Sequence, residues 1–151
     1  MYRTFKITFV DSEGRPITNS PIQDPSNEIP VLEIIVCPPN VMSGQGIRCK
    51  ALVDTGADHA VVDRSLIGRA GGALLHPVAN SGVSGQANTT LHDVTFFLTD
   101  SSGDQLAIHS DAVATDHAHK AYPVILGRSL FRHGTLVLDY NAGRFEFQVP
   151  Y

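Results

Sequence analysis

Short apolar runs broken by glycine and proline are the feature of this sequence that most limits its possible folds. The chain contains 13 Gly and 9 Pro in 151 residues, and the runs between them are rich in β-branched side chains. Such runs favour strands, and frequent turn residues interrupt any long amphipathic helix. We therefore expect an all-β fold with many tight turns.

Side-chain alternation and turn residues predict where the strands lie. Phe5, Ile7 and Phe9 alternate with polar residues, which is typical of one half-buried strand. Further strands are predicted at residues 31–36, 47–53, 60–63, 89–98, 105–113 and 122–126, with a terminal hairpin at residues 135–140 and 144–149. Residues 18–28 and 38–46 are predicted to be connections. Helix is limited to one turn at residues 64–69 and one short helix over residues 127–134, closed by Gly134.

Composition and charge argue against several classes of protein. Hydrophobic residues make up 42% of the chain and charged residues 17%, with a mean hydropathy close to zero, as in a globular domain. The formal net charge of −4 and the lack of a Lys/Arg cluster argue against nucleic-acid and membrane partners. No window reaches the roughly 18 apolar residues of a membrane helix, and residues 1–7 do not resemble an export signal. We therefore expect a cytoplasmic protein.

A carboxylate at the end of an apolar run is the most informative local feature. Residues 51–53 are apolar and lead directly into Asp54, Thr55 and Gly56. Burying an ionised carboxylate is costly unless hydrogen bonds, a proton or a second charge compensate it. Asp54 is therefore a candidate functional residue, although three common turn residues in a row are by themselves a weak motif.

Three segments in a defined order carry a resemblance to a known family. They are Asp-Thr-Gly-Ala-Asp at residues 54–58, a glycine-rich tip at residues 81–86, and an apolar-Gly-Arg segment at residues 125–128. In this order they resemble the retropepsin-like aspartic proteases, which include retroviral proteases and their cellular and bacterial relatives. The resemblance runs from about Val31 to the C-terminus, and the chain looks like a cellular or bacterial member.

This resemblance implies a fold and a domain organisation. The expected fold is an all-β closed barrel or sandwich with a glycine-rich flap hairpin and one short helix near the C-terminus. The expected organisation is a single retropepsin-like domain over residues 1–151. Within it, residues 1–28 form an N-terminal extension and residues 29–151 form the protease core.

The resemblance also implies an aspartic endopeptidase. Asp54 is then the catalytic aspartate, Thr55 hydrogen-bonds across a two-fold axis beneath it, and Gly56 lets the backbone approach the carboxylates. Two carboxylates in contact share one proton and activate a water that attacks the scissile carbonyl of a peptide or protein substrate. Because the chain carries one such triplet, the second Asp54 must come from another copy, which implies a homodimer. The shared proton predicts maximal activity on the acidic side of neutrality.

Further site residues follow from the same resemblance. The residues expected to contact substrate are Ala57, Asp58, His59, Gly82, Val83, Ser84 and Gly85. Arg128, next to Gly127, is expected to brace the active turn through a bidentate ion pair with Asp58, and a solvated loop pair is the alternative. His59 and Ser129 stand where many family members have an acid or an amide, and His59 is equally well explained as solvent-facing. An ordinary exposed hairpin is the alternative to a flap.

Other interpretations remain open from the residues alone. A retropepsin-like domain without catalysis would use the same groove to bind peptides or the same interface to dimerise. A metal-binding β-domain is weaker, because residues 116–119 (Asp-His-Ala-His) have no third ligand at a recognisable spacing, and we expect no metal or other cofactor. Cys37 and Cys49 allow a cross-strand disulfide, but two small core residues in a reducing compartment are the expectation.

The two chain ends suggest where a partner would pair. The segments at residues 1–28 and 135–151 are longer than those that compact retroviral members use for dimerisation. We expect the terminal hairpin to supply strands to the dimer interface, because pairing across a two-fold axis removes exposed sheet edges.

Overall fold

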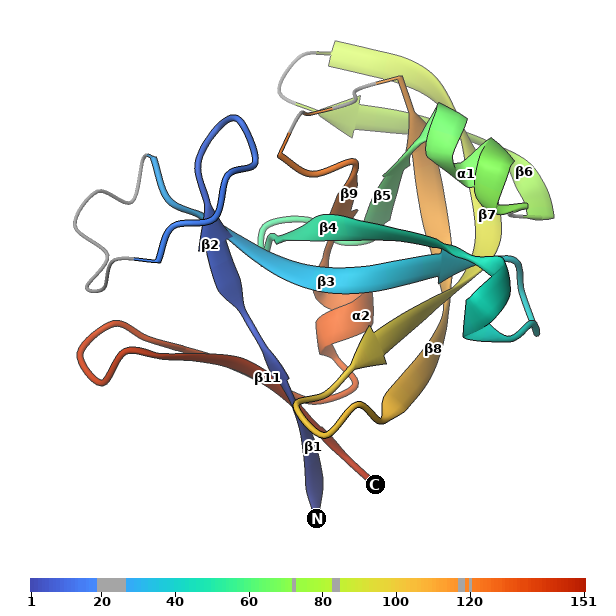
Figure 1. Ribbon diagram of the computed structural model, residues 1–151. Coiled ribbons are helices and arrows are strands. Elements are labelled where there is room, and N and C mark those ends of the chain that lie inside the picture. The colour runs from blue at the N-terminus through green and yellow to red at the C-terminus, as the bar shows by residue number, and fades with distance from the viewer. Residues whose placement is uncertain (19–26, 72, 83–84, 117–118, 120) are drawn as a thin grey trace.

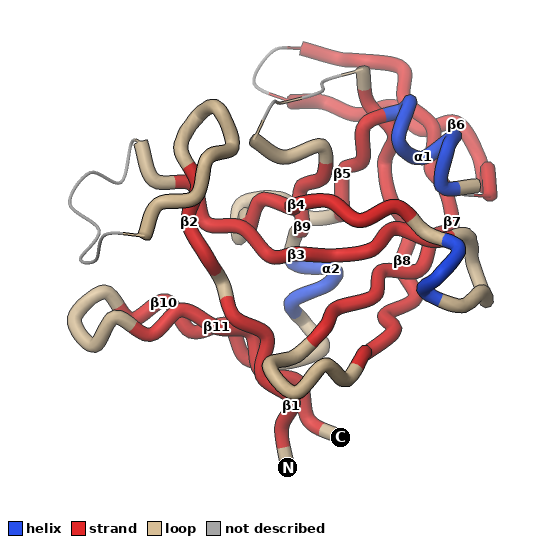
Figure 2. Tube along the Cα trace, viewed as in Figure 1, coloured by secondary structure: helices blue, strands red, loops and turns tan. Residues whose placement is uncertain are grey.

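Strands make up most of the described part of the chain (Figures 1 and 2). The computed structural model describes residues 1–18, 27–71, 73–82, 85–116, 119 and 121–151. The strands are β1 (Tyr2–Lys6), β2 (Thr8–Val10), β3 (Ile29–Cys37), β4 (Ile47–Val53), β5 (Ala60–Asp63), β6 (Ala73–Gly82), β7 (Gly85–Thr99), β8 (Gln105–Thr115), β9 (Val124–Leu126), β10 (Thr135–Asp139) and β11 (Arg144–Pro150). The helical segments are η1 (Ser43–Gln45), α1 (Arg64–Ala70) and α2 (Arg128–Phe131). The expected all-β class is confirmed.

A closed barrel forms the centre of the fold. Its strands follow the order β3, β4, β9, β5, β8 and β7, and β7 pairs back onto β3, so the sheet has no edge within this ring. β9 runs parallel to β4 and antiparallel to β5, which places the short segment at residues 124–126 in the interior of the sheet. The expected closed barrel is thus present.

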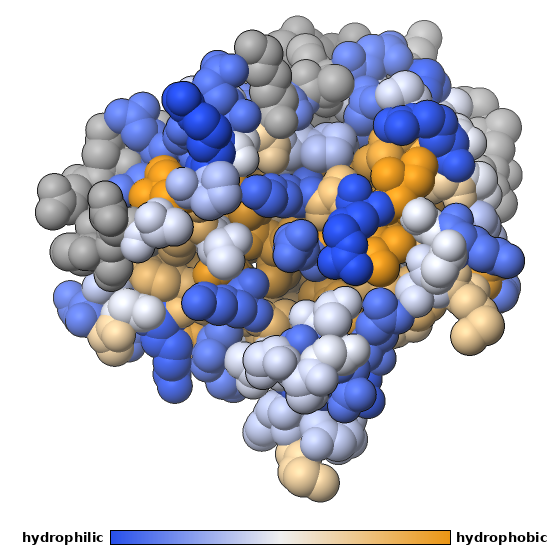
Figure 3. Space-filling model, viewed as in Figure 1, coloured by the Kyte–Doolittle hydropathy of each residue, from blue (hydrophilic) through white to orange (hydrophobic). Residues whose placement is uncertain are grey.

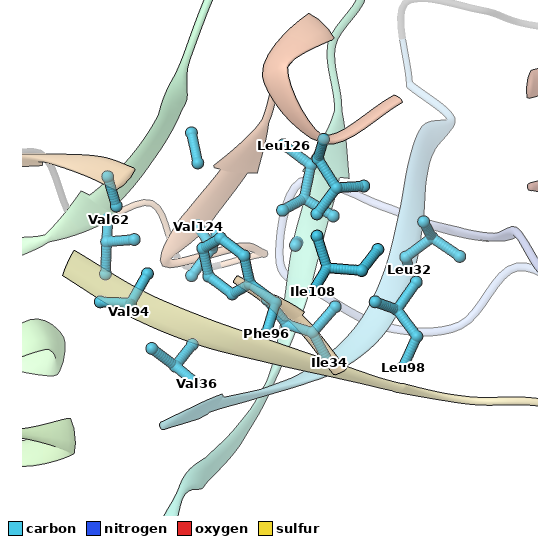
Figure 4. Close-up of a cluster of buried hydrophobic side chains, with 14 of the residues drawn as sticks. Leu32, Ile34, Val36, Val62, Val94, Phe96, Leu98, Ile108, Val124 and Leu126 are labelled. Carbon is cyan, nitrogen blue, oxygen red and sulfur yellow. The ribbon is translucent and has the colours of Figure 1, made fainter. Parts of the chain in front are cut away.

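The barrel encloses most of the hydrophobic core (Figure 4). Val94, Phe96 and Leu98 alternate along β7 and are fully buried, as expected where every second side chain of a strand points inward. They pack with Ile34 of β3 and Val124 of β9 in one cluster. Fully burying an aliphatic or aromatic side chain of this kind contributes about 1.5–3 kcal/mol, so this cluster is a main source of stability.

A second, three-stranded sheet of order β1, β11 and β10 joins the two ends of the chain. The single strand expected around residues 5–9 is wrong, because the chain changes sheets at Ile7. The Ile7 N–H donates to the Phe145 carbonyl at 3.0 Å, so β1 pairs with β11 whereas β2 pairs with β3. Phe147 in the central strand packs edge-on against Phe131 of α2 at 5.3 Å and anchors this sheet to the barrel core.

The two short α-helices differ from their expected lengths. α1 has seven residues, one more than expected. It is capped by Asp63, whose side chain accepts from the Leu66 N–H at 3.4 Å, and by Gly71 with φ +73°. α2 ends at Phe131, short of the expected residue 134. Gly134 is required for close approach rather than as a helix cap, since a Cβ there would lie 2.0 Å from the Gln148 carbonyl oxygen of β11.

β6 and η1 were not expected from the sequence. β6 contains Pro77 and lies at an edge of its sheet, where a missing N–H donor is tolerated. η1 is one 3₁₀ turn within the loop at residues 38–46. The connection expected at residues 18–28 falls largely on residues 19–26, which lie outside the described residues.

Figure 3 shows one face of the molecule, on which hydrophilic side chains dominate and apolar ones gather in smaller patches between them. Within the described residues, no helix combines the length and apolar composition needed to cross a membrane. The longest of them, α1, has seven residues.

Cys37 and Cys49 are both free thiols, so the cross-strand disulfide that the sequence allowed is absent. Cys49 of β4 pairs with Ile34 of β3, and Ile34 lies three residues before Cys37 on the same strand. Because successive side chains of a strand point to opposite faces of the sheet, the two thiols lie on opposite faces. Cys49 packs against the barrel core, whereas Cys37 lies beneath the η1 loop, with its Sγ 3.8 Å from the Met42 carbonyl oxygen.

Both thiols are expected to resist modification in the folded protein. Burial raises the pKa of Cys49 to about 12 and also raises the pKa of Cys37, so both remain protonated near pH 8 and the nucleophilic thiolate is scarce. An aromatic disulfide reagent reacts with thiolates and releases a coloured product that is measured by absorbance. It should therefore react slowly with the native protein and rapidly with both cysteines after denaturation. Rapid labelling of the native protein would contradict this burial.

Candidate active site

Asp54 follows the last residue of β4 and continues its pairing with β9. Val53 lies opposite Leu126 in the parallel ladder, and the Asp54 N–H donates to the Leu126 carbonyl at 3.1 Å. The Asp54 backbone is therefore held by the barrel, while its side chain is half-buried at the end of the strand. This is the position that the apolar run predicted.

The turn after Asp54 is stabilised by its own backbone. The Gly56 N–H donates to Asp54 Oδ1 at 2.8 Å, and the Ala57 N–H donates to the Asp54 carbonyl at 3.3 Å. A Cβ at residue 56 would lie 3.1 Å from Oδ1, so glycine leaves the carboxylate room in this turn. Within the described residues, Asp54 Oδ2 and the Thr55 hydroxyl have no hydrogen-bond partner, and Thr55 and Gly56 are exposed.

The first residues of α2 hold this turn in place. The backbone N–H groups of Arg128 and Ser129 donate to the carbonyls of Ala57 at 2.9 Å and Asp58 at 3.0 Å. A Cβ on Gly127 would lie 2.6 Å from the carbonyl oxygens of Ala57 and His59, so only glycine permits this contact without a shift of the turn.

Arg128 also pairs with Asp58, through Nη2 and Oδ1. Both side chains are about two-thirds exposed (65% and 69%), so the ion pair is solvated and adds little stability. The predicted partners are therefore correct, although the structure shows one contact between them rather than a bidentate one. The two backbone hydrogen bonds and the close approach at Gly127 do more to position the turn.

The glycine-rich segment forms the tip of a long hairpin. β6 and β7 pair antiparallel up to Gly82 and Gly85, which lie directly opposite each other. Val83 and Ser84, expected to contact substrate, lie outside the described residues.

His59 is exposed and faces a pocket that sequence reasoning missed. Its Nδ1 lies 3.8 Å from Asp111 Oδ1. The pocket has a volume of about 370 Å³ and is lined by His59, Asp93, His109, Ser110, Asp111, Ser129 and Arg132. Strands β7 and β8 and helix α2 supply five of these residues, and Arg132 follows directly after α2, so only the pairing of distant segments could reveal the pocket.

The histidine-containing segment at residues 116–119 was the sequence's candidate for metal binding. Among the described residues, no group of three or more His, Cys, Asp or Glu side chains is placed to hold a metal ion. Asp116 pairs with Arg64 at 2.9 Å, and the His119 ring stacks on Tyr122 with centroids 4.3 Å apart. His117 lies outside the described residues.

Solved structures share this fold at low sequence identity. The EIAV protease in complex with the inhibitor HBY-793 aligns with a TM-score of 0.55 and 20% identity, covering 78% of this chain and all of that one. A retropepsin-like aspartic protease from Rickettsia conorii aligns with a TM-score of 0.54 and 11% identity, covering 99% of this chain and 93% of that one. No protein-family model matches the sequence, and no curated protein matches it. At these identities the likeness concerns the fold alone, and the chain has the retropepsin-like fold.

Proposed function

We propose that the protein is an aspartic endopeptidase of the retropepsin-like family that acts as a homodimer. The observation that carries this proposal is the Asp54 carboxylate, which a rigid turn presents at the end of a barrel strand in a chain with the fold of such proteases. The backbone contacts from α2 to Ala57 and Asp58 support it, because a catalytic carboxylate must be positioned accurately.

The proposed chemistry uses a pair of Asp54 carboxylates, one from each subunit, that share a proton. The ionised carboxylate takes a proton from a water held between them, and the water oxygen attacks the scissile carbonyl carbon. The protonated carboxyl gives its proton to the carbonyl oxygen. Collapse of the tetrahedral intermediate breaks the C–N bond, and the leaving amine receives a proton from the dyad. No covalent bond to the enzyme forms.

The described protomer is incomplete for this reaction, which supports a dimer. Each chain has one Asp-Thr-Gly, and the open hydrogen-bonding positions on Asp54 Oδ2 and the Thr55 hydroxyl lie at the exposed end of the site. In the proposed dimer these groups meet their symmetry mates. Residues 29–151 then form the protease core, and residues 1–28 form an extension that contributes β1 and β2.

Substrate would bind as an extended strand between the active turn and the flap. Backbone hydrogen bonds from such grooves give affinity, and pockets for alternate side chains give specificity. Ala57 and His59 would border the bound peptide below, and Gly82 and Gly85 would approach it from the flap.

The terminal sheet offers one open edge for the proposed interface. β11 lies between β1 and β10, so the outer strands alone have free edges. The β1 edge is close to the β7–β8 turn, since Arg3 Nη1 donates to the Gln105 carbonyl at 2.6 Å. β10 carries the exposed Leu138 and is followed by Tyr140, which is 52% exposed. We therefore assign dimerisation to antiparallel pairing of β10 with the partner's β10.

Deleting residues 144–151 would be a poor test of this interface, because the deletion removes the central strand of the terminal sheet and the buried Phe147.

Leu138→Lys tests this interface. A charge on an edge strand opposes pairing, so we expect the dimer dissociation constant to rise at least about tenfold, equivalent to about 1.4 kcal/mol. Analytical ultracentrifugation over a dilution series measures the shift. Met42→Lys, at an 80% exposed site near η1, is the matched control and should leave the dimer unchanged. Equal dissociation constants for the two variants would contradict the assignment to β10.

Peptidase activity and molecular mass, measured together over a dilution series, test the proposed function. We expect cleavage of a denatured protein substrate, best at mildly acidic pH, with specific activity that falls as the dimer dissociates. Peptide binding without cleavage would instead favour a non-catalytic binding module. A fully active monomer would exclude the shared dyad.

A further inference from the structure

The pocket beside the active turn has an unusual arrangement of charges. Asp93 of β7 and Asp111 of β8 lie directly opposite each other on the antiparallel ladder. Like charges in that position are destabilising. Each carboxylate faces a histidine instead, since His109 Nε2 lies 2.8 Å from Asp93 Oδ1 and His59 Nδ1 lies 3.8 Å from Asp111 Oδ1. Both carboxylates therefore already have a partner of potentially opposite charge.

Two groups, one on α2 and one on its C-terminal cap residue, have no such partner. The Arg132 guanidinium lines the pocket and, within the described residues, forms no ion pair or hydrogen bond. The Ser129 Oγ is buried and makes no hydrogen bond in the described structure. A buried hydroxyl without a partner is costly, and a free guanidinium is the side chain best suited to bind a carboxylate. Both observations indicate a ligand with negatively charged oxygens.

The net charge of the pocket favours the same ligand under acidic conditions. The charged and titratable groups that line it are His59 from the active turn, Asp93 from β7, His109 and Asp111 from β8, and Arg132 at the C-terminal cap of α2. With both histidines protonated, the two His–Asp pairs are neutral and Arg132 leaves a charge of +1. With both histidines neutral, the two carboxylates outweigh Arg132.

The position of the pocket connects it to the proposed substrate groove. His59 lines the pocket and lies five residues after Asp54. The Ser129 N–H is bonded to the Asp58 carbonyl, so the pocket wall and the active turn form one continuous structure. A volume of about 370 Å³ accommodates one substrate side chain and its solvent.

We propose that this pocket is a subsite for an acidic side chain of the peptide substrate, whose carboxylate is bound by the Arg132 guanidinium and the Ser129 hydroxyl. The assignment of the ligand as a substrate residue rests on the proposed peptidase function. The pocket's affinity for carboxylate does not depend on catalysis.

A binding selection with an inactive protein tests the proposal separately from catalysis. Immobilised Asp54→Asn protein is incubated with a randomised peptide library at about pH 5 and at about pH 7.5, and bound peptides are sequenced. We expect Asp or Glu to be enriched about tenfold at one position at the lower pH, and less at the higher pH. Arg132→Gln in the same background should abolish the enrichment. Arg69→Gln, which removes the same charge from an exposed site on α1, should retain it.

Several outcomes would overturn the subsite. One is a set of bound peptides without acidic enrichment at any position, or no bound peptide at all. The others are enrichment of Lys or Arg, and an acidic preference that survives Arg132→Gln. The proposed function has its own readout, which is cleavage of the library by the wild-type protein. Cleavage without acidic preference would reject the subsite and leave the peptidase, whereas acid-selective binding without cleavage would reject the peptidase and leave the pocket.

Discussion

Asp54→Asn is expected to abolish peptide hydrolysis and leave the fold intact. Asn has nearly the same shape, and its carbonyl oxygen still accepts the Gly56 N–H that Asp54 Oδ1 accepts at 2.8 Å. An amide cannot take a proton from water or return one to the leaving amine. Because general acid–base catalysis contributes about 10²–10⁴-fold, and both halves of the dyad are lost, we expect kcat/KM to fall by at least about 10³-fold.

The measurement is initial cleavage rate at matched dimer concentration, with circular dichroism and thermal unfolding as checks of the fold. Asp104→Asn, at an exposed position between β7 and β8, is the matched control and should keep full activity. Adding excess Asp54→Asn protein to the wild type should also reduce wild-type activity, because mixed dimers contain one carboxylate. Unchanged activity on mixing would indicate that each subunit works alone, and retained activity of the variant would reject Asp54 as catalytic.

Gly127→Ala is expected to damage both stability and activity through a single methyl group. The added Cβ would lie 2.6 Å from two carbonyl oxygens of the active turn, those of Ala57 and His59. The turn and α2 must separate, which weakens the backbone bonds from Arg128 and Ser129. Overpacking of this kind costs about 1–3 kcal/mol and each weakened hydrogen bond about 1 kcal/mol, so we expect a loss of about 3 kcal/mol.

Urea unfolding monitored by fluorescence or circular dichroism gives the change in the free energy of unfolding. Gly68→Ala is the matched control, because a Cβ there meets nothing within 4 Å and alanine favours helix, so that variant should be slightly more stable. Gly127→Ala should also lose peptidase activity in the absence of urea, where it remains folded, because displacement of the turn moves Asp54. Wild-type stability in Gly127→Ala would contradict the close contact between α2 and the turn.

Local sequence patterns predicted the barrel strands well where alternation was strong. Val94, Phe96 and Leu98 recur at every second position, and their burial follows directly from strand geometry. The pattern failed where the chain changes partners. Phe5 to Phe9 alternate without interruption, yet the two halves belong to different sheets, because the pairing partners β11 and β3 are remote in sequence.

The sequence by itself determined the all-β class, the position of Asp54 at the end of β4, and the hairpin that pairs Gly82 with Gly85. These features depend on strand periodicity and turn chemistry, which are local. The pairing of Asp58 with Arg128, 70 residues apart, was expected only from the family resemblance. The charged pocket was decided by tertiary structure alone, because Asp93 meets Asp111, and Arg132 joins them, only when β7, β8 and the C-terminal end of α2 come together. The open edge of β10 has the same origin, since an edge is defined by which strands pair and which do not.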